Sequence, residues 1–186
     1  MSNTPEVNWR ALSWQQTGLR FLWLTLLILV LDQSSKLWIL NNIEFMRDRI
    51  EVTSFFNIIH VRNYGAAFSF LADHSGWQRW FFTTIAIVVS GVLLVMLRRQ
   101  PLTMRRVNIA FALIIGGAIG NVIDRIRLGS VVDFLDVHYA GWHWPAFNVA
   151  DSAIVIGAGL MILDSLLAIR EEQREKKRNA KGHKHG

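Results

Sequence analysis

The sequence predicts a membrane-embedded all-α fold: one integral membrane domain, residues 1–186, with four transmembrane helices and a small β-rich segment outside the bilayer. Hydrophobic residues make up 52% of the chain and charged residues only 18%, which is rare for a soluble domain. Apolar stretches recur at lengths near the roughly 20 residues needed to cross a bilayer core. The connection between the first two stretches is rich in β-branched and aromatic residues, which favour strands.

The first transmembrane helix is expected at about residues 19–39. Basic residues precede its apolar core, as in a cleavable signal sequence, but no small-residue cleavage site follows, so we expect a retained helix. Asp32 and Lys36 interrupt its end. Because they are four residues apart, they lie on one helix face and can form an ion pair. Either this pair only neutralises itself near the outer interface, or it takes a direct part in chemistry.

Residues 41–75 are too long for a turn and too apolar for a linker. They contain "IEVTSFFNIIHVRNYGAAFSFL", in which Asn63 and Gly65 mark a turn. We expect short strands on the outer membrane surface here.

The second and third helices are expected at about residues 79–98 and 107–125, where charged residues are absent from the apolar cores. Gly116, Gly117 and Gly120 place small residues on the third helix, which allows another backbone to approach closely.

Polar residues Asn121, Asp124 and Arg125 follow at the outer end of the third helix. Arg125 is suited to orient or neutralise a carboxylate. Alternatively, Asp124 and Arg125 satisfy each other.

The second outward connection contains Asp133 between apolar neighbours in "SVVDFLD". Such surroundings should desolvate the Asp133 carboxyl group and raise its pKa, so that a protonated form can act as an acid. The alternative is an aspartate that simply belongs to a turn.

The fourth helix is expected at about residues 148–169. Asn148 suits an N-cap, and Asp151 then lies at N3, where its carboxylate reaches back to the cap amide. Asp133 and Asp151 both belong to the outer end of the bundle. Two carboxylates that share a proton can activate a water molecule and protonate a leaving group, which is peptide hydrolysis without a metal.

The distribution of basic residues predicts the orientation in the membrane. The N-terminus, the linker "RRQPLTMRR" and the basic tail 170–186 should be cytoplasmic, and the other connections should face outward. We interpret the tail as a solvated segment rather than a nucleic-acid-binding one.

Other chemistries have weaker support. The chain has no cysteine, which excludes thiol nucleophiles, thiolate metal sites and disulfides. No His pair has the HExxH spacing and no serine lies in a G-x-S-x-G turn, so we expect no metal and no cofactor. A rival class is a small proton-coupled transporter or membrane assembly factor, in which Asp32, Lys36 and Asp151 relay protons.

Five motifs over residues 19–169 resemble, in order, those of the lipoprotein signal peptidase (signal peptidase II) family. They are "DQSSK", "VRNYGAAF", "GGAIGNVIDR", "VVDF" and "FNVADS". The resemblance implies an aspartic endopeptidase of the bacterial inner membrane. It would cleave signal peptides from diacylglyceryl prolipoproteins just before the lipidated cysteine.

The resemblance also implies roles for particular residues and partners. The catalytic dyad falls on Asp133 and Asp151, and the outward strands correspond to the family's β-cradle. Membrane lipid and globomycin-type peptide inhibitors are implied partners. The supporting polar positions are Asp32, Lys36, Asn63, Asn121, Asp124, Arg125 and Asn148.

Overall fold

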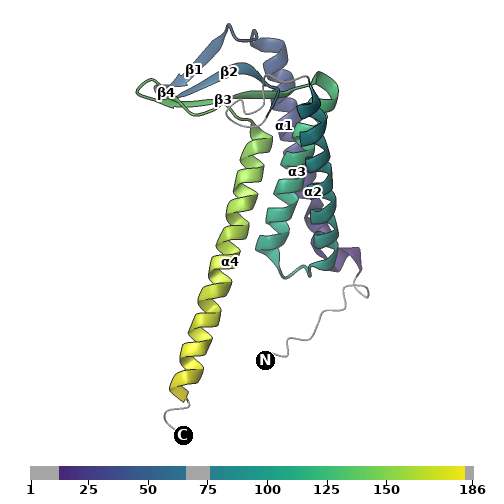
Figure 1. Ribbon diagram of the computed structural model, residues 1–186, viewed down its shortest axis with the longest axis vertical. Coiled ribbons are helices and arrows are strands. Elements are labelled where there is room, and N and C mark those ends of the chain that lie inside the picture. Colours follow the sequence, from purple (N-terminus) through teal and green to yellow (C-terminus); the bar gives the residue numbers. More distant parts are fainter. Residues whose placement is uncertain (1–12, 66–75, 183–186) are drawn as a thin grey trace.

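A computed structural model describes residues 13–65 and 76–182. Its long helices are α1 (Leu22–Asn42), α2 (Trp77–Arg99), α3 (Arg105–Leu128) and α4 (Val149–Gly182), and two 3-10 turns, Trp14–Gln16 and Gly18–Phe21, lead into α1. Figure 1 shows α1, α2 and α3 side by side, with α4 alongside α3 at one end. All four helices are long and apolar enough to cross a membrane, which confirms the predicted fold class.

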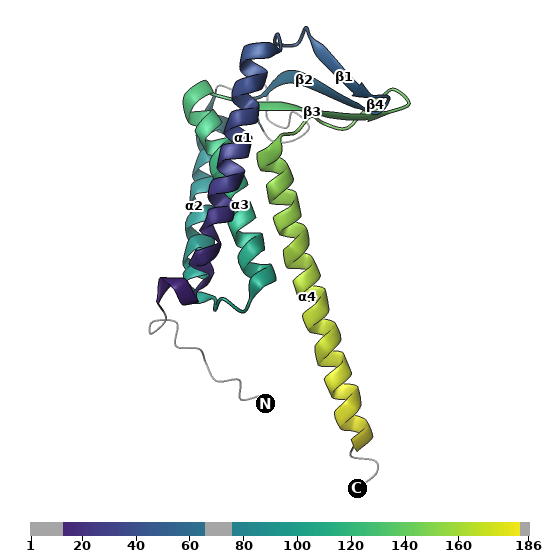
Figure 2. The same ribbon diagram turned by 180° about the vertical axis from the view of Figure 1, so that it is seen from behind.

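Helix α4 is longer than the sequence analysis predicted. The helix continues past residue 169, the predicted end of the fourth transmembrane span, through most of the basic tail to Gly182. Glu, Gln, Arg and Lys are good helix formers. Glu172 and Lys176 add an ion pair four residues apart on this part of the helix. The last turns of α4 therefore extend beyond the bundle, at the end opposite the sheet (Figure 2).

A four-stranded antiparallel sheet lies across one end of the helices, in the order β1 (Arg49–Thr53), β2 (Phe56–Asn63), β3 (Val131–Tyr139) and β4 (Trp142–His143). The predicted strands between the first two helices are present as β1 and β2. The second outward connection, in which no strands were predicted, supplies β3 and β4. The end of the β-rich range 41–75 lies outside the described residues.

The register of β2 against β3 brings the two connections together. Val61 pairs with Asp133, and Asn63 pairs with Val131. The two strands are separated by α2 and α3 in the sequence, so this pairing fixes Asn63 next to the start of β3.

Helix α3 is central and packs against α1, α2 and α4. Its small residues permit this, as predicted. A Cβ atom at Gly117 would collide with the Ala150 carbonyl oxygen of α4, and one at Gly120 would lie 2.7 Å from an Asp32 carboxylate oxygen of α1. Gly117 therefore lets α3 lie close to the first turn of α4, and Gly120 lets it lie close to the polar end of α1, as predicted.

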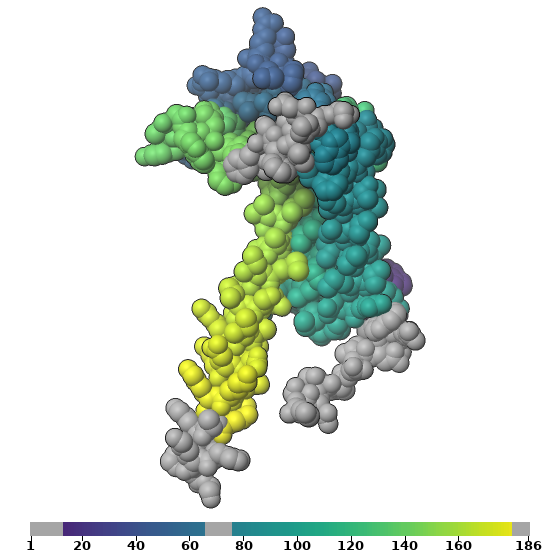
Figure 3. All heavy atoms as spheres, in the orientation of Figure 1, coloured from purple at the N-terminus to yellow at the C-terminus, as the bar shows by residue number. Residues whose placement is uncertain are grey.

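The outward faces of the other helices are apolar. Leu26 of α1 is 63% exposed, Val88 of α2 is 58% exposed and Ile162 of α4 is 63% exposed. In a membrane-spanning bundle these side chains face lipid rather than water. Figure 3 shows the sheet capping this bundle, with α4 leaning away from the other helices at its far end.

Candidate active site

A buried ammonium group lies at the centre of the polar end of the bundle. Lys36 is 2% exposed, and its Nζ lies 2.9 Å from Asp32 and 2.9 Å from Asp124. It also donates to Asn121 Oδ1 at 2.9 Å. The predicted Asp32–Lys36 pair is confirmed. The suggestion that Asp124 and Arg125 satisfy each other is wrong, because Asp124 pairs with Lys36.

This ion cluster also fixes the backbone around it. Asp32 accepts a hydrogen bond from the Ala150 amide at 3.0 Å, and Asp124 accepts one from the Val132 amide at 3.1 Å. The first bond ties α1 to the beginning of α4. The second ties α3 to β3.

Sequence reasoning did not single out Gln33. Its amide nitrogen donates to Asp32 at 3.1 Å, to Asp124 at 3.1 Å and to the Gly120 carbonyl at 3.2 Å. The residue lies inside the quoted "DQSSK" motif, between the two charged positions, and this adjacency was the available signal.

Asp133 lies in β3 and is only 2% exposed, so its interpretation as a turn aspartate is wrong. Its carboxylate accepts hydrogen bonds from Asn63 at 3.1 Å and from Asn148 at 2.7 Å. Burial, reinforced by the negative charge of Asp151, raises the pKa of Asp133 to about 7, although the two amide hydrogen bonds oppose that rise. The expected shift of the Asp133 pKa is present.

Asp151 lies in the first turn of α4, where the predicted capping box is confirmed. Its backbone amide donates to Asn148 Oδ1 at 2.9 Å, and its carboxylate accepts from the Asn148 amide at 3.2 Å. The same carboxylate accepts a hydrogen bond from Asn121 Nδ2 at 2.8 Å. Capping therefore leaves one carboxylate oxygen bonded to Asn148 and the other bonded to Asn121.

Asn148 connects the two aspartates. It is completely buried, and its side chain donates to Asp133 while its backbone amide donates to Asp151. Asn121 extends this link, since it accepts from Lys36 and from Asn148 while it donates to Asp151. One chain of hydrogen bonds thus runs from the Lys36 cluster to both carboxylates.

Arg125 stands apart from the Lys36 cluster. Its guanidinium donates to the Gly65 carbonyl at 3.4 Å and lies over the Phe82 ring, 5.4 Å from the ring centre. It faces the same cavity as Asp151. This position fits the predicted role of a cation that orients or neutralises a carboxylate.

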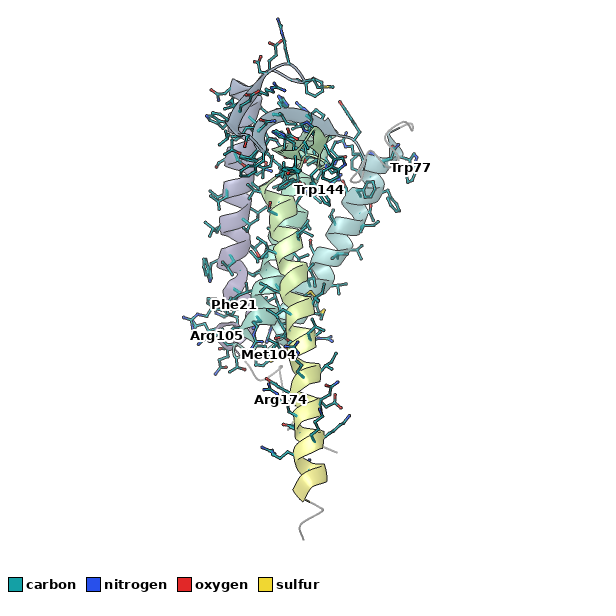
Figure 4. All side chains as sticks on the ribbon, turned by 90° about the vertical axis from the view of Figure 1, so that its left-hand side faces the viewer. Phe21, Trp77, Met104, Arg105, Trp144 and Arg174 are labelled. Carbon is teal, nitrogen blue, oxygen red and sulfur yellow. The ribbon has the colours of Figure 1, made fainter. Side chains whose placement is uncertain are left out.

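That cavity has a volume of about 590 Å³ and lies between the sheet and the start of α4. Asn63, Arg125 and Asp151 supply polar groups. Its other lining residues are mainly apolar and come from the segment before α4 and from the outward face of that helix, such as Trp144, Phe147, Val155 and Ile156. Val155 is 70% exposed, so the cavity continues onto the lipid-facing side of α4. Figure 4 shows Trp144 at the sheet end of this helix.

Asp133 does not line this cavity. Asn63, which donates a hydrogen bond to Asp133, does line it. The carboxylate pair therefore has one member facing the cavity and one member directly behind its polar wall.

A second polar cluster fastens the segment that lines the cavity. Asp136 accepts hydrogen bonds from Asn57 at 2.9 Å and interacts with His143 Nδ1 at 2.7 Å. Burial opposes ionisation, but the bonds from His143 and Asn57 outweigh it and lower the pKa of Asp136. Sequence reasoning missed this cluster because Asn57, Asp136 and His143 come from different strands.

Four apolar helices, a capping sheet and paired carboxylates at one end of the bundle define a multi-pass membrane protein with a buried acidic site. Residues 24–167 match the family model described as signal peptidase (SPase) II. The lipoprotein signal peptidase of Shewanella loihica is 53% identical over 163 residues, which covers 88% of this chain and 95% of that one. The Vibrio cholerae lipoprotein signal peptidase is 55% identical over 159 residues, 85% of this chain and 93% of that one.

A solved structure described as a bacterial membrane enzyme has the same fold. It superposes with a TM-score of 0.71 at 32% identity, covering 79% of this chain and 92% of the solved chain. The chain belongs to the signal peptidase II family, and it is therefore a membrane peptidase of lipoprotein processing.

Proposed function

We propose that this protein is an aspartic endopeptidase that removes the signal peptide from diacylglyceryl prolipoproteins by cleaving before the lipidated cysteine. Asp133 and Asp151 form the catalytic pair. The observation that carries this proposal is the shared contact of both carboxylates with the buried Asn148. The Asn148 side chain bonds Asp133 and the Asn148 backbone amide bonds Asp151, so one buried residue holds the two acids in a fixed relation, which general acid–base catalysis requires.

The substrate is recognised at the membrane edge. The apolar signal helix lies against the lipid-facing surface beside the cavity, and the diacylglyceryl chains stay in lipid next to Val155 and Ile156. The scissile bond then reaches the polar end of the cavity, at Asn63, Arg125 and Asp151. Arg125 supplies a positive charge near the carbonyl oxygen that becomes anionic during attack.

The two aspartates share one proton in the resting enzyme. The ionised carboxylate takes a proton from a water molecule, which attacks the scissile carbonyl while the protonated carboxyl group donates toward the carbonyl oxygen. The tetrahedral intermediate collapses as a proton passes to the leaving cysteine amine. The raised pKa of Asp133 supports a carboxyl group that holds a proton near neutral pH. The pair titrates as a unit.

Asp32, Lys36, Asn121 and Asp124 act as supporting residues. Their ion cluster fixes Ala150, Val132 and Asn121, which adjoin the catalytic pair.

The protein resides in the bacterial inner membrane with both termini in the cytoplasm and the active site near the periplasmic face. Globomycin-type peptides inhibit it by occupying the same cavity.

The test is cleavage of a diacylglyceryl prolipoprotein by the purified full chain. Asp133→Asn and Asp151→Asn should each lower the rate by at least about a hundredfold, since general acid–base catalysis contributes on the order of 10²–10⁴. Near-normal cleavage by either variant would show that the pair is wrongly assigned.

Asp136→Asn is the matched control, because Asp136 is a buried aspartate on the same strand but outside the pair. It should lose far less activity than Asp133→Asn, because Asp136 holds the segment that lines the cavity but does not contact the pair. Asp124→Asn should lose folded yield or part of the activity. Complete loss of activity in a well-folded Asp124→Asn sample would contradict its supporting role.

The transporter alternative gains no support from the geometry. The buried charged side chains of the described chain gather near the sheet end, in Asp32, Lys36, Asp124, Asp133 and Asp136. A proton relay requires such groups across the bilayer depth.

A further inference from the structure

A second cavity lies at the end of the bundle opposite the sheet. It has a volume of about 350 Å³ and is lined by Arg20, Phe21, Trp23, Leu102 and Arg105. Figure 4 shows Phe21 and Arg105 together at this end, far from Trp144. Two guanidinium groups and two aromatic rings thus border one hollow, and none of the described residues that line it carries a carboxylate.

Arg20 and Arg105 differ from the neighbouring Arg106, which has an acidic partner. Arg106 lies 3.6 Å from Asp164 of α4 and is paired there. Arg20 and Arg105 form no ion pair within the described residues 13–65 and 76–182. Both side chains are exposed, so this hollow is an unpaired cationic patch that attracts an anion.

The walls of this cavity are fixed by the fold. The Gly18 amide donates to the Gln100 carbonyl at 2.9 Å, and the Leu102 amide donates to the Gln16 carbonyl at 3.0 Å. The buried Asn108 donates to the Pro101 carbonyl at 2.9 Å. These bonds join the segment before α1 to the loop before α3, so the backbone positions of Arg20 and Arg105 are set before any ligand binds.

The position of the cavity indicates the kind of anion. Arg20 precedes α1 and Arg105 is the first residue of α3, so both guanidinium groups lie where two apolar spans end and the headgroup layer begins. Trp23 is 60% exposed and lines the same cavity. Arginines recognise phosphate through paired charged hydrogen bonds, while a tryptophan at this depth packs against the glycerol and upper acyl region.

We propose that this cavity binds the phosphate group of an anionic phospholipid, with Arg20 and Arg105 on the phosphate and Trp23 beside the upper acyl chains. The site is separate from the proposed active site and does not depend on the reaction assigned to it. It gives the bundle a specific lipid contact at the membrane face opposite the sheet.

The test measures lipid binding to the full chain in detergent by native mass spectrometry, using dioctanoyl phosphatidylglycerol as the anionic probe. The parent should bind it at least about tenfold more tightly than dioctanoyl phosphatidylcholine. Arg20→Gln/Arg105→Gln should weaken phosphatidylglycerol binding by about tenfold or more, because each charged hydrogen bond contributes roughly a tenfold step in affinity.

Arg170→Gln/Arg174→Gln is the matched control. It removes the same charge from exposed positions on the far part of α4, and Figure 4 shows Arg174 beyond the end of the bundle. This control should bind phosphatidylglycerol as the parent does. Prolipoprotein cleavage by each variant shows that the protein is folded. Cleavage and lipid binding are separate measurements, so a failure of the proposed peptidase function would not change the lipid result.

Three results would overturn the proposal. If both double variants lose affinity for phosphatidylglycerol equally, the loss is caused by net charge and not by this cavity. If Arg20→Gln/Arg105→Gln binds phosphatidylglycerol as the parent does, the lipid does not bind at this cavity. Inorganic phosphate that competes as well as the lipid at equal concentration would make the ligand a free phosphate rather than a phospholipid.

Discussion

Asn63 contributes one hydrogen bond to the ionised form of Asp133. Removing a bond to the carboxylate disfavours ionisation, so Asn63→Ala should raise the pKa of Asp133 further above about 7. Activity that requires the protonated acid would then persist to higher pH. We expect the alkaline limb of the cleavage pH profile to move upward in Asn63→Ala.

The pH profile of the cleavage rate over pH 5 to 10 checks this prediction. Asn57→Ala is a suitable control, because Asn57 bonds Asp136 rather than Asp133. An alkaline limb that stays in place or moves downward in Asn63→Ala would contradict a requirement for the protonated Asp133 carboxyl group in cleavage.

Lys36 compensates the negative charges of two buried carboxylates, Asp32 and Asp124. Lys36→Met leaves Asp32 and Asp124 without their common cation, and breaking a buried pair costs roughly 3–5 kcal/mol. We expect a large drop in the thermal midpoint of the detergent-solubilised protein. Adding Asp124→Asn to Lys36→Met should recover part of the loss. A double variant less stable than Lys36→Met would show that charge is not the cause.

At the scale of whole elements, the contact between α3 and α4 depends on a missing side chain. Gly117 lets the Ala150 carbonyl lie against α3, and Ala150 adjoins Asp151 in the first turn of α4. Gly117→Ala should push this turn away from α3, which costs on the order of 1–3 kcal/mol and misplaces Asp151. We expect cleavage to fall by at least about tenfold, since small displacements of catalytic groups have large effects.

Gly91→Ala is the control for this substitution. Gly91 lies inside α2, and nothing surrounds the position of a Cβ atom there. Alanine should leave cleavage unchanged and slightly favour the helix. Equal effects of Gly91→Ala and Gly117→Ala would indicate a loss of helix flexibility rather than a lost close approach.

The far part of α4 illustrates an element without packing partners in the described chain. Residues 171–179 are exposed on every side, although they are helical. Because this exposed part of the helix lies about 30 Å along the helix axis from Asp151, a chain that ends after Arg170 should cleave within about twofold of the parent. Measuring the cleavage rate of the truncated protein checks this, and a tenfold loss would assign the extension a role in the reaction.

At the scale of the whole molecule, the proposed orientation can be tested by labelling, because the chain has no native cysteine. Ser54→Cys lies in the exposed turn between β1 and β2, and Lys176→Cys lies on exposed α4. A membrane-impermeant maleimide added to cells with a permeabilised outer membrane should label the first and not the second. The reverse pattern would place the sheet in the cytoplasm.

The sequence determined the elements that depend on local composition. Uninterrupted apolar stretches define spanning helices because lipid requires every backbone polar group to bond within its own segment. The i, i+4 spacing of Asp32 and Lys36 and the N-cap spacing of Asn148 and Asp151 are also local, and both predictions were confirmed.

Contacts between distant residues depend on the three-dimensional fold. It paired β2 with β3, which brought Asn63 to Asp133, and it directed Asp124 to Lys36 instead of Arg125. It also placed Asn148 between Asp133 and Asp151 and joined Arg20 to Arg105 around one cavity. Periodicity and spacing describe neighbours along one helix or strand. The contacts between elements depend on register and close packing, which are set by the fold as a whole.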